Sequence, residues 1–160
     1  LKLLAKEVGI KTPLIDSISQ SNAELINRLE LFITDQKYID IVFCGISFKP
    51  NTDDIRNSPI VIVINNLLTM KRSYQRKLNI SIYDSKEALR NFFNQTELKI
   101  GTIDDMNKLL IMGDVIVLGP YKISNDLVMR MLKQDKIIID LKWHILEDDV
   151  ISHPNYHSLV

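Results

Sequence analysis

The sequence lacks three features that would assign a protein class at once: paired cysteines, an excess of charge of either sign, and a long apolar run. Its single cysteine, Cys44, excludes an internal disulfide framework. Twenty lysine and arginine residues balance twenty aspartate and glutamate residues, so no net field draws the chain to nucleic acid or an anionic membrane. Without a run of about eighteen apolar residues or a charged leader, a cytoplasmic location is expected.

The first 35 residues are expected to be helical and to form an appendage to one compact domain. Gly9 ends a first helical stretch, and Thr12 followed by Pro13 is typical of a helix start. A helical period of apolar residues then continues over residues 14–34. This helix could pack on its own domain alone, or also against a second subunit or another domain. We favour the second interpretation because one domain would cover so long a helix poorly.

Residues 36–160 alternate between strand and helix patterns. Parallel strands joined by helices of this length predict an α/β fold, a Rossmann-like, doubly wound and mainly parallel sheet preceded by the long helix. The expected strands are residues 38–44, 80–83, 98–100, 114–118 and 136–140, and the expected helices are residues 60–70, 86–93, 105–112 and 125–132. Ser58 followed by Pro59 is expected to cap the first of these helices.

The first loop after a buried strand carries an unusual sequence, FCGISFKPNTDDIRNSP, over residues 43–59. In a doubly wound sheet this loop lies at the carboxyl ends of the strands, where ligands bind. The dinucleotide fingerprint G-x-G-x-x-G is incomplete, because Gly45 is followed by Ser47 and Pro50 at the other two glycine positions. The loop is therefore not a standard pyrophosphate turn.

The same loop still offers groups that bind anions. Lys49 carries a compact ammonium charge, and Arg56 carries a planar guanidinium group with forked donors. The helix expected after Ser58 presents free N–H groups at its start. Asp53 and Asp54 can cap turns or orient Arg56. From the residues alone, an ion-paired loop without a ligand is an equally acceptable interpretation.

The stretch GISFKPNTDDIRNSP resembles the GxxFKxxTDDxRxSP signature that opens the C-terminal, UDP-binding domain of the UDP-glucose/GDP-mannose dehydrogenase family. The helix containing Asn22 resembles the family's central dimerisation helix, and NISIYD and IIIDLKWHIL resemble its second and last strands. Members oxidise the primary alcohol of a nucleotide-linked sugar twice, to the carboxylate, reducing two NAD and passing through a thioester on a cysteine.

The resemblance implies roles for four residues. Phe48 and Lys49 match positions that contact the UDP-sugar, and Arg56 matches an arginine that reaches NAD. Lys142 stands where many members have an arginine for the substrate, and a lysine cannot make the bidentate contact. Ser85, in place of a proline, and GPYKIS after the fourth strand also depart from the family pattern.

By the same resemblance, the NAD-binding domain, the catalytic lysine and asparagine, and the nucleophilic cysteine would all precede Leu1. We therefore expect residues 1–35 to be the end of the central helical segment, a homodimer to form through residues 14–34, and the 160 residues alone to be inactive. The alternative is a free-standing, non-catalytic nucleotide-binding or dimerisation module derived from the family. Which sugar is bound, and whether its carrier is UDP or GDP, stays open.

Other candidate sites have simpler interpretations. Cys44 ends an apolar strand and is expected to be a buried hydrophobe. His153 and His157 are separated by Pro154 and lack a third metal ligand nearby, so no metal is expected. Asp84, after the second strand, is interpreted first as a turn or cap residue. The basic stretch KRSYQRK is interpreted as a solvated connection, so no nucleic-acid partner is expected.

Overall fold

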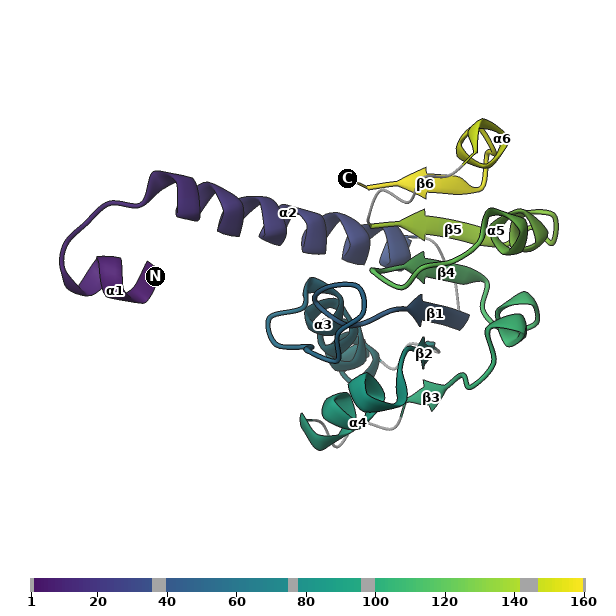
Figure 1. The fold of residues 1–160 in the computed structure, drawn as a ribbon, viewed down its shortest axis with the longest axis horizontal. Coiled ribbons are helices and arrows are strands. Elements are labelled where there is room, and N and C mark those ends of the chain that lie inside the picture. Colours follow the sequence, from purple (N-terminus) through teal and green to yellow (C-terminus); the bar gives the residue numbers. More distant parts are fainter. Residues whose placement is uncertain (1, 36–39, 75–77, 96–99, 142–146, 160) are drawn as a thin grey trace.

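The computed structural model describes residues 2–35, 40–74, 78–95, 100–141 and 147–159. The elements of this part of the chain alternate after the first two helices (Figure 1). The helices are α1 (Lys2–Glu7), α2 (Pro13–Asp35), α3 (Pro59–Tyr74), α4 (Lys86–Gln95), α5 (Asn125–Leu132), α6 (Asp148–Ile151) and a 3₁₀ helix, η1 (Met106–Leu110). The strands are β1 (Asp40–Cys44), β2 (Asn79–Tyr83), β3 (Gly101–Thr102), β4 (Val115–Leu118), β5 (Ile137–Asp140) and β6 (Tyr156–Ser158).

The strands form one sheet in the order β3-β2-β1-β4-β5-β6, and every neighbouring pair is parallel. The chain moves outward from β1 through β2 and β3, then crosses back to add β4, β5 and β6 on the other side of β1. The strand order therefore reverses between β1 and β4, which makes the carboxyl ends of these two strands the ligand-binding position of a doubly wound sheet. The predicted fold class is confirmed.

Successive side chains of the central strand enter two different cores. Ile41 and Phe43 of β1 pack in a cluster with buried residues of α2, α3 and α4. Val42 and Cys44 pack in a second cluster with buried residues of η1, α5 and α6. A strand buried on both faces needs apolar residues at consecutive positions, which explains the continuous run IVFC.

Helix α2 is buried at one end only. Near its carboxyl end Leu29 and Ile33 are 1% and 2% exposed, and the Phe32 ring lies 4.9 Å from the His157 ring of β6. Toward its amino end Leu14 and Ile18 are 77% and 57% exposed, and Figure 1 shows this half extending beyond the sheet with α1 beside it. Among the described helices, none is both long and apolar enough to cross a bilayer.

The sequence patterns placed most elements correctly and misplaced a few. Helix α5 has the predicted bounds. The third strand, expected at residues 98–100, is found one step later at Gly101–Thr102, and residues 98 and 99 lie outside the described part. The helix expected at 105–112 is a single 3₁₀ segment capped by Asp105. Helix α6 and the edge strand β6 were not predicted. The strand sequence YHS has no apolar alternation by which it could be identified.

Candidate functional site

A cavity of about 1030 Å³ opens at the carboxyl ends of β2, β1 and β4, and we call it the strand-end cavity. Three loops form its wall, one from each strand. The lining residues are Gly45, Ser47 and Lys49–Asp53 after β1, Asp84, Ser85 and Glu87 after β2, and Pro120–Ile123 after β4. The cavity thus lies at the switch point of the sheet, the position at which this architecture binds ligands.

Two glycines let the loops after β1 and β4 approach each other closely. A methyl group at Gly45 would lie 2.7 Å from the backbone nitrogen of Tyr121, and one at Gly119 would overlap the carbonyl oxygen of Gly45. Gly45 also has a φ of +90°, a conformation that other residues rarely adopt. The backbones of these two loops therefore meet at the inner end of the crevice, and the cavity opens beside them, with Gly45 in its lining.

Asp84 joins the loops after β2 and β1. Its Oδ2 accepts hydrogen bonds from the backbone nitrogen of Ile46 at 2.6 Å and from the nitrogen and hydroxyl of Ser47 at 3.2 and 3.0 Å. Its Oδ1 accepts from the nitrogen of Ser85 at 2.6 Å, and the Ser85 hydroxyl accepts from the nitrogen of Ala88 in α4. Asp84 is therefore a turn residue, as interpreted from the sequence, and also a cross-link between two loops.

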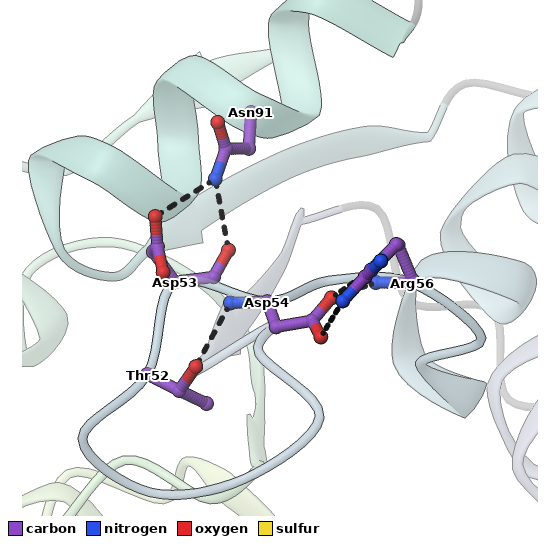
Figure 2. Close-up of polar contacts among 5 residues, drawn as sticks. All are labelled: Thr52, Asp53, Asp54, Arg56 and Asn91. Carbon is purple, nitrogen blue, oxygen red and sulfur yellow. Dashed lines mark hydrogen bonds and ion pairs between the residues drawn. The ribbon is translucent and has the colours of Figure 1, made fainter.

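The loop that carries the signature motif is braced by its own polar groups (Figure 2). The Phe48 nitrogen donates to the carbonyl of Asp54 at 2.7 Å, which closes residues 48–54 into a ring. The Thr52 hydroxyl accepts from the Asp54 nitrogen at 3.1 Å. From α4, the Asn91 amide nitrogen donates to the carbonyl and the carboxylate of Asp53 at 3.0 and 3.1 Å. These contacts fix the backbone of the loop that carries Lys49.

Arg56 forms a two-pronged pair with Asp54. Arg56 Nε lies 2.9 Å from Oδ1, and its terminal nitrogen lies 2.7 Å from Oδ2. Figure 2 marks both contacts with dashed lines. Hydrogen bonds from Arg56 lower the pKa of Asp54 to about 2, and the same bonds raise the pKa of Arg56. The Arg56 side chain is 80% exposed, and a surface pair of this kind contributes little to stability.

The structure brings together only part of the predicted site. Lys49 lines the strand-end cavity, and its ammonium lies 5.8 Å from the ring of Phe48, which is 51% exposed. Arg56, although in the same loop, is not among the residues that line the cavity. Lys142 lies outside the described residues. The roles of these four residues stay predictions.

Sequence reasoning assigned no site role to the residues that follow β2 and β4 at the cavity, and Glu87, Tyr121 and Lys122 are among them. Tyr121 stacks edge to face on Tyr83, with ring centroids 5.0 Å apart. One signal could have found them: they follow the strands that flank β1, and the carboxyl ends of parallel neighbours meet at one edge.

The predicted cap at Ser58 is only half right. Its carbonyl accepts from the nitrogen of Ile62, so α3 begins where the Ser-Pro pair predicts. Its hydroxyl, however, is buried and makes no hydrogen bond to the part of the chain that the structure describes. Pro59, which lacks an N–H, and the backbone turn start this helix without help from the serine side chain.

The two histidines considered for a metal contact other residues of the described chain. His153 Nδ1 accepts from the backbone nitrogen of Asn155 at 3.2 Å, and the His157 ring packs against Phe32. Burial lowers the pKa of His157, which favours its neutral form.

Cys44 is expected to be unreactive in the folded protein. Burial, with a smaller effect of the Asp84 charge, raises its pKa to about 12, and its thiol is 0% exposed. A thiolate is the reacting species, so a chromogenic disulfide reagent should label no thiol in buffer and one per chain in urea. Rapid labelling in buffer would show that β1 is not buried as described.

Comparison with known proteins agrees with this geometry. Residues 42–146 match the model of the UDP-glucose/GDP-mannose dehydrogenase family, UDP binding domain. A GDP-mannose 6-dehydrogenase of Pseudomonas putida is 29% identical over 125 residues, covering 72% of this chain and 27% of the relative. The UDP-glucose 6-dehydrogenase of Bacillus subtilis is 24% identical over 160 residues, covering 98% of this chain and 34% of the relative.

Two solved structures have the same fold. GDP-mannose dehydrogenase from Pseudomonas aeruginosa superposes with a TM-score of 0.68 at 20% identity, covering 99% of this chain and 36% of that one. UDP-glucose dehydrogenase from Pyrobaculum islandicum superposes with a TM-score of 0.67 at 16% identity, covering 98% of this chain and 34% of that one. The chain thus spans between 27% and 36% of the length of these relatives. Since the family model matches well over half of the sequence, the chain belongs to the UDP-glucose/GDP-mannose dehydrogenase family and contains its UDP binding domain.

Proposed function

We propose that this chain is the nucleotide-sugar-binding part of an NAD-dependent nucleotide-sugar dehydrogenase, which oxidises the primary alcohol of the sugar to the uronate. The observation that carries the proposal is the strand-end cavity, which lies at the switch point of a domain of this family and is lined by Lys49. An ammonium group beside an open, partly polar cavity suits the diphosphate of an activated sugar.

In this proposal the chain binds and orients the substrate. Lys49 pairs with the diphosphate, the exposed ring of Phe48 covers part of the nucleotide, and Lys142 contacts the substrate from the segment after β5. The chemistry of oxidation is supplied elsewhere, because the single cysteine of these 160 residues is buried in β1. The 160 residues alone are then inactive.

The crevice of this chain does not fit NAD. The glycine fingerprint is incomplete, the loops after β1 and β4 meet at Gly45 and Gly119, and Asp84 already occupies the N–H groups of the first turn. NAD, which accepts a hydride when it is bound, is held mainly by residues outside this sequence. Arg56 would reach it only after exchanging its contact with Asp54.

The proposal is tested by NAD reduction with the full-length protein across a panel of UDP- and GDP-linked sugars. The panel includes both carriers because relatives are named for each. One substrate should be oxidised with two NAD reduced per sugar. Nucleotide-sugar binding without any NAD reduction would instead support the alternative, a non-catalytic binding or dimerisation module.

The exposed half of α2 is proposed to pack against a second copy of the chain. Leu14 and Ile18 lie on this half, and Leu4, Val8 and Ile10 beside it are 64%, 68% and 63% exposed. Sedimentation should give a dimer that the double change Leu14→Glu and Ile18→Glu converts to a monomer. The control is Ile151→Glu, which alters another exposed apolar residue, 50% exposed, on α6 and should leave the dimer intact.

A further inference from the structure

The turn after β1 has the geometry of an anion site. Its chain passes through Gly45 at a φ of +90°, after which the backbone N–H groups of Ile46 and Ser47 and the Ser47 hydroxyl converge on one point. Ile46 and Ser47 are 0% and 5% exposed, so these donors need a partner. Successive N–H groups arranged in this way bind phosphate in many nucleotide-binding turns.

The point on which these donors converge is Oδ2 of Asp84. In a dinucleotide-binding domain the acidic residue after the second strand binds a ribose hydroxyl of the ligand. Here the carboxylate faces inward: Oδ2 holds the turn, and Oδ1 holds the nitrogen of Ser85 at the start of α4. The charged group that fits the turn is therefore part of the protein.

We propose that Asp84 is a built-in substitute for phosphate, a specificity-determining residue that closes the first turn to any phosphate of a bound ligand. Three donors on one oxygen, two of them backbone N–H groups of a buried turn, leave no room for a second anion at that point. An entering phosphate would also meet the carboxylate's negative charge. Closure of the inner crevice by Gly45 and Gly119 acts in the same direction.

This inference deepens the proposed function, on which the identity of the ligand rests. A nucleotide diphosphate in the strand-end cavity would have to be bound by side chains farther out, Lys49 among them, and not by backbone N–H groups as in a dinucleotide-binding domain. The exclusion of phosphate from the turn, however, follows from the contacts of Asp84 alone. It can be tested without any nucleotide or sugar.

The test is a titration of the ¹⁵N-labelled protein with inorganic phosphate, followed by the amide signals of Ile46 and Ser47. The parent should show no saturable change at these two amides. Asp84→Ala removes the internal anion and should give saturable changes at both. Asp84→Asn keeps an oxygen for the same donors and should behave like the parent. Glu87→Ala is the matched control, because it removes a negative charge from the same cavity without freeing the turn.

Saturable changes at both amides in the parent, or none in folded Asp84→Ala, would overturn the proposal. Equal responses in Asp84→Ala and Glu87→Ala would also overturn it, since they would reflect cavity charge alone. If Asp84→Ala does not fold, a measurement on the parent protein alone still tests the proposal. A scalar coupling across the hydrogen bond from the Ile46 amide to the Asp84 carboxyl carbon should be detected, and its absence contradicts the proposal. Failure of nucleotide-sugar oxidation would change none of these results.

Discussion

Replacing Gly119 with alanine is expected to destabilise the protein by about 3 kcal/mol or more, the upper range for overpacking a rigid site. The added methyl group would overlap the carbonyl oxygen of Gly45 and lie 2.5 Å from the Cδ1 atom of Ile60. The isoleucine can rotate, but the carbonyl belongs to the backbone of the neighbouring loop. Relief would require β1 and β4 to separate at the switch point, where Gly119 N donates to the carbonyl of Cys44.

The measurement is urea unfolding followed by circular dichroism, with Gly101→Ala as the control. A methyl group at Gly101 would meet first the hydroxyl of Ser81, the end of a small side chain that can rotate away. Gly101→Ala should therefore cost clearly less. If Gly119→Ala unfolds within about 0.5 kcal/mol of the parent, a typical surface effect, the close approach of the two loops is wrong.

For the full-length protein, the proposed function predicts that Lys49→Ala raises the KM for the nucleotide sugar about tenfold or more while kcat changes little. A hydrogen bond to a charged group is worth about 1.5–3 kcal/mol, and the lower end applies to an exposed lysine. When a lost contact is equally strong in the ground state and the transition state, its loss raises KM and leaves kcat unchanged. Steady-state kinetics with each substrate varied in turn separates the sugar from NAD.

The control for Lys49 is Lys133→Ala, which removes an exposed lysine at the C-cap of α5, away from the cavity lining. It should leave both Michaelis constants unchanged. Arg56→Ala provides the opposite pattern, because Arg56 is proposed to reach NAD. If Lys49→Ala changed only the KM for NAD, the roles assigned to the two cations would be wrong.

Most of the fold could be predicted from local patterns, because the spacing of apolar residues in a segment indicates which of its faces are buried. The run IVFC requires burial on both faces, and it lies in β1 at the centre of the sheet. Ser-Pro located the start of α3. In the described part of the chain the third strand consists of Gly101 and Thr102, which have no apolar pattern, and β6 was missed because an edge strand need not alternate.

The site was harder to predict, because its contacts join residues far apart in sequence. Nothing near Asp84 shows that its carboxylate turns toward residues 37 and 38 positions earlier. The pairing of Arg56 with Asp54 was one of two outcomes that the loop allowed. An arginine two residues from an aspartate can form an ion pair either with that aspartate or with a bound ligand. Lys49 lines the cavity because it lies in the loop after β1, and its contact with the substrate stays a prediction.

The central claim is that the strand-end cavity binds a nucleotide diphosphate, and amide signals of the labelled protein titrated with UDP and with GDP test it most directly. We predict saturable changes at Lys49, Ser85 and Tyr121, which face the cavity from three different loops. Saturable changes confined to Gly113 and Lys136, at the amino ends of β4 and β5, or no change at any cavity residue, would contradict the account.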